Sequence, residues 1–265
     1  MNTTLLFQEI RRALPFFALL ALGLAVYSIV FVAVFPSVQS EMAEMLKAVP
    51  PLLRPLVKAH VGLDAFENFL ATGYLHPVAL GLMASWAVSC GAQAVAGEIE
   101  QGTLGWMLAY PIGRVRFLLT KAWVLLGGAV LLAALLGLGF WQTATLLGVS
   151  HLNIQTYVLL SANTALLYGA IGMLTLWASA ASSERGKPGM LGGGLFVVSF
   201  LLNYVTQLWA PLHRYRCLSL FAYYDPRAVL LAHGLPWQNS LVLGGLLVVG
   251  LLAAVTTFAR RELTI

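Results

Sequence analysis

Charged residues are scarce in this chain. Asp, Glu, Lys and Arg make up only 9% of its 265 residues and 60% are hydrophobic, whereas soluble domains carry about 25% charged residues. A soluble domain could not bury so much apolar surface, so the composition excludes that class and predicts an all-α polytopic membrane protein. The net charge of +5 comes without a run of five basic residues, which argues against a nucleic-acid partner.

The sequence also lacks the motifs of common catalytic and metal sites. It has no GxxxxGK[ST] phosphate loop, no HExxH, no GxSxG and no convincing Ser/His/Asp arrangement. Its two cysteines, Cys90 and Cys217, lie in different regions without a CxxC or Cys/His spacing. The five histidines do not cluster; they are His60, His76, His151, His213 and His233. We therefore predict no catalytic residue, no metal site and no cofactor held by this chain itself.

Long apolar stretches dominate what is present. We place six membrane spans near residues 14–35, 77–96, 117–141, 156–180, 190–209 and 239–258. Each is close to the roughly 20 residues that cross a bilayer as a helix. No segment between the spans is long enough for a soluble domain, so residues 1–265 are predicted to form a single transmembrane domain.

Two segments outside the spans have helical patterns of their own. The apolar positions in residues 1–13 fall on one face, which predicts a short helix lying in the membrane interface. The alternative is a tail continuous with the first span. In the long 37–76 connection, apolar residues from Val38 to Val49 recur at helical spacing until prolines break the pattern. A second short helix is expected around Leu63–Leu70.

The distribution of Lys and Arg sets the orientation. With the N-terminus inside, the short inner segments hold Arg11, Arg12, Arg114, Arg116, Lys121, Arg185, Lys187, Arg260 and Arg261. The longer outer segments hold fewer, namely Lys47, Arg54, Lys58, Arg214, Arg216 and Arg227. Both termini are therefore predicted to be cytoplasmic.

A polar segment, Gly97–Leu104, separates the second and third spans. Its carboxylates, Glu98 and Glu100, are costly so close to hydrocarbon unless they meet water or a partner. They stand at a helix start, where the helix dipole favours acids, and Gly102 and Thr103 offer a bend and a helix cap. The basic residues expected to pair with at least one carboxylate are Arg11, Arg12 and Arg116.

We predict a short helix over residues 98–110, standing off the membrane. Leu104, Met107 and Leu108 form an apolar face at i, i+3 and i+4 that could insert into a partner's groove. Pro111 ends this helix. The alternative is a plain loop with interfacial acids.

The spans themselves lack the groups that couple transport to ions. No Asp or Glu lies deep in a predicted span, and Lys121 is near enough to the inner end of the third span to reach water. Ion-coupled transporters usually carry intramembrane carboxylates or broken helices. If this protein moves a substrate uphill, the energy must therefore enter through a partner that docks on the cytoplasmic side.

The polar segment carries a family resemblance. The run from Gly97 to Leu104, followed by Tyr110-Pro111, Arg114 and Lys121, is similar to the signature of type-2 ATP-binding-cassette permeases. Two further segments resemble that family, Phe221–Pro226 its outer-loop YxDP pattern and Phe258–Leu263 its usual F-x-R-R-[DE]-L ending. The resemblance covers the whole chain and agrees with the six-span topology.

The resemblance implies the membrane subunit of an exporter. The chain would pair with a second copy or a homologous permease and engage a separate ATP-binding subunit, which would hold ATP and Mg. Residues 1–13 would be the connecting helix and residues 98–110 the coupling helix. The ATPase-coupling residues would be Glu98, Glu100, Gly102, Thr103, Leu104, Met107, Leu108, Pro111 and Arg114. The chain itself would hydrolyse nothing and would lie in the cell membrane among lipids.

The second and fifth spans would line the pathway of such a dimer. The polar residues proposed for that lining are Ser89, Gln93, Ser199, Asn203 and Gln207. Such a mostly apolar, uncharged lining suits an amphiphile, such as a hydrophobic peptide, an antibiotic or a lipid-like molecule. The alternative is that these residues only hold helices together and do not contact a substrate. Two other classes also stay open, a membrane assembly protein and a membrane-embedded enzyme, and co-purification of an ATPase would separate them from a transporter.

Overall fold

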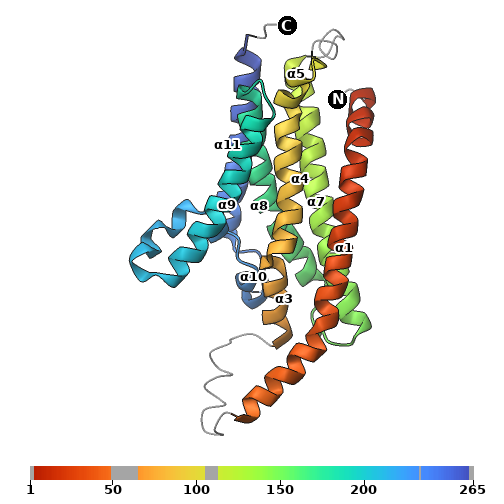
Figure 1. Cartoon of the computed structure of the whole chain (residues 1–265), viewed down its shortest axis with the longest axis vertical. Helices are drawn as coiled ribbons and strands as arrows, with labels where there is room; N and C mark the ends of the chain where they lie inside the picture. Colours follow the sequence, from red (N-terminus) through yellow and green to blue (C-terminus); the bar gives the residue numbers. More distant parts are fainter. Residues whose placement is uncertain (1–2, 49–64, 105–112, 233, 263–265) are drawn as a thin grey trace.

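The computed structural model describes residues 3–48, 65–104, 113–232 and 234–262 (Figure 1). Within these ranges all of the regular secondary structure is helical. The long helices are α1 (Thr3–Ala48), α4 (Pro77–Ala92), α7 (Arg114–Leu146), α8 (Ile154–Ala181), α9 (Gly186–Leu208) and α11 (Trp237–Arg260). The shorter elements are α3 (Ala65–Leu75), the π-helix η1 (Gln93–Gly97), α5 (Glu98–Glu100), the 3-10 helices η2 (Ala210–Leu218) and η3 (Leu220–Ala222), and α10 (Pro226–Ala232).

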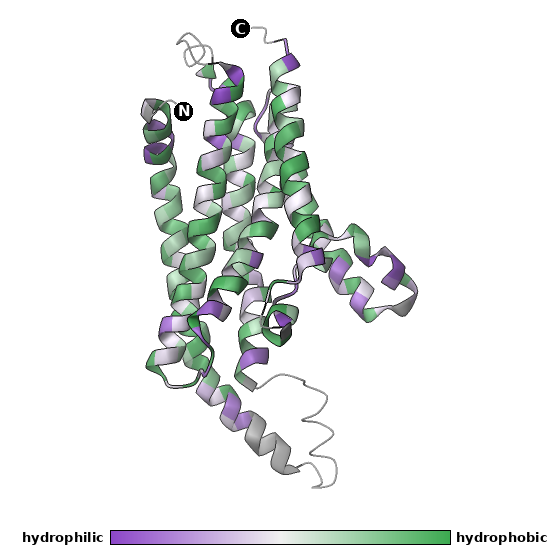
Figure 2. Cartoon of the chain, turned by 180° about the vertical axis from the view of Figure 1, so that it is seen from behind, coloured by the Kyte–Doolittle hydropathy of each residue, from purple (hydrophilic) through white to green (hydrophobic). Residues whose placement is uncertain are grey.

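The predicted fold class is confirmed. Six helical segments among the described residues are long and apolar enough to cross a membrane, and each overlaps one predicted span. Figure 1 shows both ends of the chain at the same end of the bundle, which we call the terminal end. The opposite end is the far end. Figure 2 shows hydrophobic residues along most of the length of the long helices. Many of their large apolar side chains are exposed, as expected where a bundle faces lipid.

The first span is longer than predicted. Helix α1 is continuous from Thr3 to Ala48 and contains Pro15 and Pro36, so the expected separate helices over residues 1–13 and after Val38 are both continuations of the span. The N-terminal extension packs inward: Glu9 is 7% exposed and pairs with a lysine of α7. This tertiary contact, which the local pattern could not reveal, keeps the extension in line with the span.

Helix α8 is the centre of the bundle. It is the most buried of the six candidate spans and packs against α4, α7, α9 and α11. Two glycines allow close approach: a Cβ on Gly91 of α4 would lie 2.8 Å from the Cβ of Thr175, and a Cβ on Gly250 of α11 would lie 3.0 Å from the carbonyl carbon of Met173. Small residues at such crossings let helix backbones pack closely in membranes.

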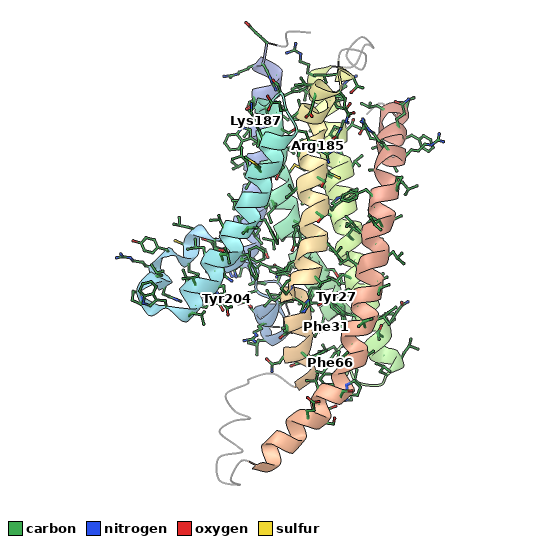
Figure 3. All side chains as sticks on the ribbon, viewed as in Figure 1. Tyr27, Phe31, Phe66, Arg185, Lys187 and Tyr204 are labelled. Atoms are coloured by element: carbon green, nitrogen blue, oxygen red, sulfur yellow. The ribbon has the colours of Figure 1, made fainter. Side chains whose placement is uncertain are left out.

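At the far end, α1 is anchored by aromatic residues. Tyr27 donates a hydrogen bond from its hydroxyl to the carbonyl of Gly73 over 2.8 Å. The ring of Phe31 stacks on Phe69 of α3 and meets Phe140 of α7 edge-on (Figure 3). Helix α1 is therefore held by aromatic packing near its middle and by ion pairs near its N-terminus.

Candidate functional site

The last turn of the second span is a π-helix. Over Gln93–Gly97 the backbone leaves the α-helical pattern, which frees amide and carbonyl groups that must find other partners. The buried hydroxyl of Ser179 on α8 supplies them. It donates to the carbonyl of Ala92 over 2.9 Å and accepts from the amides of Val95 and Ala96 over 3.1 and 2.9 Å. One side chain of α8 thus locks this end of α4.

Directly after the π-helix, Glu98 is fully buried. Its Oε1 accepts hydrogen bonds from Nη1 of Arg12 over 2.6 Å and from Nζ of Lys121 over 2.7 Å. Its Oε2 accepts one from the hydroxyl of Thr103. Lys121 also pairs with Glu9 at 2.7 Å. We refer to Glu9, Arg12, Glu98 and Lys121 as the Glu98 cluster.

The Glu98 cluster is electrically balanced, with two carboxylates and two cations. Lys121 is 7% exposed, so it is a buried partner of two carboxylates and not the water-reaching residue that its position predicted. Burying charges is costly, and removing one member of a buried pair costs about 3–5 kcal/mol because its partner stays buried and unpaired. The cluster joins α1, α5 and α7, and the loss of any one of its charges should therefore be costly.

The rest of the polar segment is a tight turn. Gly102 has φ +68°, a left-handed conformation that favours glycine, and the amide of Thr103 returns to the carbonyl of Glu98 over 3.0 Å. Oε2 of Glu100 accepts a hydrogen bond from the backbone amide of Arg185 over 2.6 Å. The second carboxylate therefore ties the segment to the connection between α8 and α9.

The C-terminal end of α11 joins the same region. Nη1 of Arg261 donates to the carbonyls of Ala180 and Ser182 over 3.0 and 2.7 Å, and Nη2 donates to Oγ of Ser183 over 2.6 Å. Arg114, predicted as a coupling residue, donates from Nη1 to the carbonyl of Arg261 over 2.7 Å. The terminal end is thus cross-linked from α7 through α11 to the end of α8.

The predicted apolar docking face is only partly described. Leu104 is 4% exposed and belongs to an internal cluster with Leu5, Phe117 and Phe258. Its side chain therefore packs against this chain, which corrects the expectation that it inserts into a partner. Within the predicted helix over residues 98–110, only Glu98–Glu100 form α5 before the turn at Gly102. Residues 105–110, which include Met107 and Leu108, and Pro111 after them lie outside the described residues.

A polar cavity of about 360 Å³ adjoins the Glu98 cluster. Its lining includes Ser89 and Gln93 of α4, together with Cys90 and Arg185. Oε1 of Gln93 is buried without a hydrogen-bond partner among the described residues. Two of the predicted pathway residues thus open onto the space beside the ion cluster.

The other three predicted pathway residues lie further along α9. A Cβ on Gly189 would be 3.9 Å from the Cβ of Ala92, so the start of α9 is level with the end of α4. Figure 3 shows Arg185 and Tyr204 toward opposite ends of α9. The residues on the far part of α9 are Ser199, which is buried, Asn203, which is half-buried, and Gln207, which is exposed. The five residues therefore form two separate groups.

The sequence predicts Glu98, Glu100 and one correct partner, Arg12, but it does not predict the roles of four other participants. One of these is Lys121, which was expected to reach water. Ser179 carried no signal because serine is common within membrane helices. Arg261 entered the sequence analysis through the charge distribution and the C-terminal motif, without a predicted hydrogen-bond partner. Glu9 lies in the segment that was expected to form a separate interfacial helix, and only the fold brings it to Lys121.

The fold and the site together define a polytopic helical membrane protein with an ion-paired junction at the end that carries both termini. Residues 4–263 match the family model described as "ABC-2 family transporter protein", so the chain belongs to that family. Membership makes it a transmembrane subunit of an ABC transporter, with the ATPase activity in a separate ATP-binding subunit. A search of curated proteins found no match to the chain.

Proposed function

We propose that this chain is one of two six-span subunits of an ATP-driven exporter, and that the Glu98 cluster transmits movement from the ATP-binding subunit to the spans. The observation that carries the proposal is the position of Glu98, whose buried carboxylate bonds both α1 and α7. Its neighbour Glu100 bonds the connection between α8 and α9. A displacement of the polar segment would therefore act on several helices at once.

The proposed orientation places the terminal end in the cytoplasm and the bundle in the cell membrane. Basic residues gather at this end, in agreement with the charge bias of cytoplasmic segments. The polar segment lies at the same end (Figure 1), where a cytoplasmic ATP-binding subunit that holds ATP and Mg could reach it. The part of the predicted coupling segment that follows the turn at Gly102 would make that contact through Met107 and Leu108.

The proposed cargo is an amphiphile, such as a hydrophobic peptide, an antibiotic or a lipid-like molecule. Ser89 and Gln93 would meet it near the terminal end, and Ser199, Asn203 and Gln207 would meet it farther along the pathway. These side chains offer hydrogen bonds without charge, whereas a bare ion would need charged or closely spaced oxygen ligands. A second copy or a homologous permease would close the other side of the pathway.

Purification of the tagged chain from its own membranes tests this function. We expect a separate ATP-binding subunit to co-purify and the complex, but not the chain alone, to hydrolyse ATP. A membrane assembly protein would bring no ATPase with it, and hydrolysis by the isolated chain would indicate a membrane-embedded enzyme.

The coupling role needs a second measurement. In proteoliposomes, Glu98→Gln should lower transport more than ATP hydrolysis, because a neutral amide keeps the size of the side chain but loses both ion pairs. Glu184→Gln is the matched control, because Glu184 is exposed and its one ion pair within the described ranges is with Lys187, three residues away. Equal loss of transport in the two variants, or unchanged transport in Glu98→Gln, would contradict the coupling role.

A further inference from the structure

An apolar groove of about 260 Å³ lies between the first halves of α1 and α7. Leu6, Ile10 and Leu14 form one wall, and Trp123 and Gly127 form the other. The outward side chains are well exposed, with Leu14 at 54% and Trp123 at 63%. A carbon-lined groove on the outer face of a membrane bundle meets lipid, so an acyl chain is the ligand that it fits.

The floor of the groove is built by interlocking side chains. The ring of Trp86 is 2% exposed, and its Nε1 donates to the carbonyl of Leu125 over 2.9 Å. Phe17 meets this ring edge-on, with centroids 5.5 Å apart. A Cβ on Gly128 would lie 2.0 Å from Trp86, whereas a Cβ on Gly127 would meet nothing within 4 Å. Gly128 therefore serves packing, while Gly127 leaves the groove open.

The charges around the groove favour an anionic lipid. Arg11 and Arg116 are exposed, and neither has an ion-pair partner among the described residues. The nearby carboxylates of the Glu98 cluster are already paired with Lys121 and Arg12. Arg116 precedes Trp123 by two helical turns, so both lie on one face of α7. Free cations thus flank the terminal end of an apolar groove, a pattern that attracts anionic headgroups.

We propose that this groove binds one anionic phospholipid from the leaflet at the terminal end. An acyl chain lies along Trp123 and Gly127, and the phosphate lies beside Arg116 and Arg11. Ala13 and Val124 line both this groove and the polar cavity of the Glu98 cluster. The bound lipid therefore braces α1 against α7 at the level of the ion pairs. This inference does not depend on the proposed export function.

Native mass spectrometry of the detergent-purified chain tests the site with dioleoyl phosphatidylglycerol and dioleoyl phosphatidylcholine as probes. We expect the wild type to retain phosphatidylglycerol about five-fold or more over phosphatidylcholine, as one or two arginines near a phosphate would give. Gly127→Leu fills the groove and should lose the retained lipid. Gly245→Leu is the matched control, because Gly245 is exposed on α11 and a Cβ there also meets nothing within 4 Å.

Arg116→Gln separates the charge from the groove. This variant should keep the bound lipid but lose most of the preference for phosphatidylglycerol. Equal retention of both lipids by the wild type would overturn the anionic assignment. Unchanged retention in Gly127→Leu, or the same loss in Gly245→Leu, would overturn the site. The melting temperature of each glycine variant shows whether that variant is folded. A loss of lipid is interpreted only for a variant whose melting temperature matches that of the wild type.

Discussion

The Nζ atom of Lys121 and the Oε1 atom of Glu98 lie 2.7 Å apart in the interior of the bundle. The two residues belong to different helices, α7 and α5, and Lys121 also holds Glu9 of α1. One ammonium group therefore joins three helices at the terminal end of the bundle. This junction determines what the variants below should do.

Replacing Lys121 should destabilise the chain more than replacing any exposed lysine. In Lys121→Met, Glu9 would keep no ion-pair partner among the described residues and Glu98 would keep only Arg12, so we expect a loss of about 3–5 kcal/mol in the free energy of unfolding. Reversible unfolding in mixed micelles measures it.

Lys187→Met is the control for this prediction. Lys187 pairs with Glu184 at 3.3 Å, but both side chains are more than 60% exposed, and such surface pairs contribute less than about 1 kcal/mol. Similar losses in the two variants would show that the buried junction adds no special stability.

Ser179→Ala should loosen the π-helix at the end of the second span. The amides of Val95 and Ala96 would lose their acceptor, and an unmade buried hydrogen bond costs about 1–3 kcal/mol. Hydrogen exchange of residues 93–97 should accelerate by about ten-fold or more. Ser182→Ala is the control, because among the described residues the hydroxyl of Ser182, the C-cap of α8, donates only to the carbonyl of Ala178. Unchanged exchange in Ser179→Ala would mean that the π-helix holds without it.

The six spans could be predicted because each long helix carries an apolar run of bilayer length. The importance of Glu98 could also be predicted, since a carboxylate beside a hydrocarbon core requires a partner. Its pairing with Lys121 could not be, because a lysine near the end of a span can reach either water or a buried acid. That choice depends on Glu9, which only the tertiary fold brings close.

Two other features could not be assigned correctly from the sequence. The residues of the π-helix, Gln93–Gly97, read like any small-residue segment of a membrane helix, and its bonds come from Ser179 on a helix far away in the sequence. Leu104 had the apolar spacing of a docking face, but helical spacing alone does not distinguish a partner's groove from the chain's own core. Here the core is formed with Leu5 and Phe117.

Substitution by a charged residue should therefore have different effects at Leu104 and at Met107. Leu104→Asp buries a carboxylate in an apolar cluster and should destabilise the chain itself by several kcal/mol. Met107→Asp, on the remaining predicted docking face, should leave the melting temperature of the chain unchanged and weaken binding of the ATP-binding subunit. Unfolding of the purified chain measures its stability, and co-purification measures binding of the ATP-binding subunit. Intact complex formation by Met107→Asp would remove this helix as the contact, and normal stability of Leu104→Asp would contradict its burial.

Asn203 and Gln207 should face the central pathway of the proposed dimer. They lie one turn apart on α9 and so share a face. Oδ1 of Asn203 is buried without a hydrogen-bond partner among the described residues, and an unpaired amide is costly away from water. The Asn203→Leu/Gln207→Leu variant should therefore change substrate-stimulated ATP hydrolysis by the complex without dispersing it. Thr256→Val on α11 is the control, because Thr256 is exposed and, within the part of the chain that the structure describes, its hydroxyl donates only to carbonyls of its own helix. Unchanged stimulation in the double variant, with the complex intact, would leave these amides a role in helix packing alone.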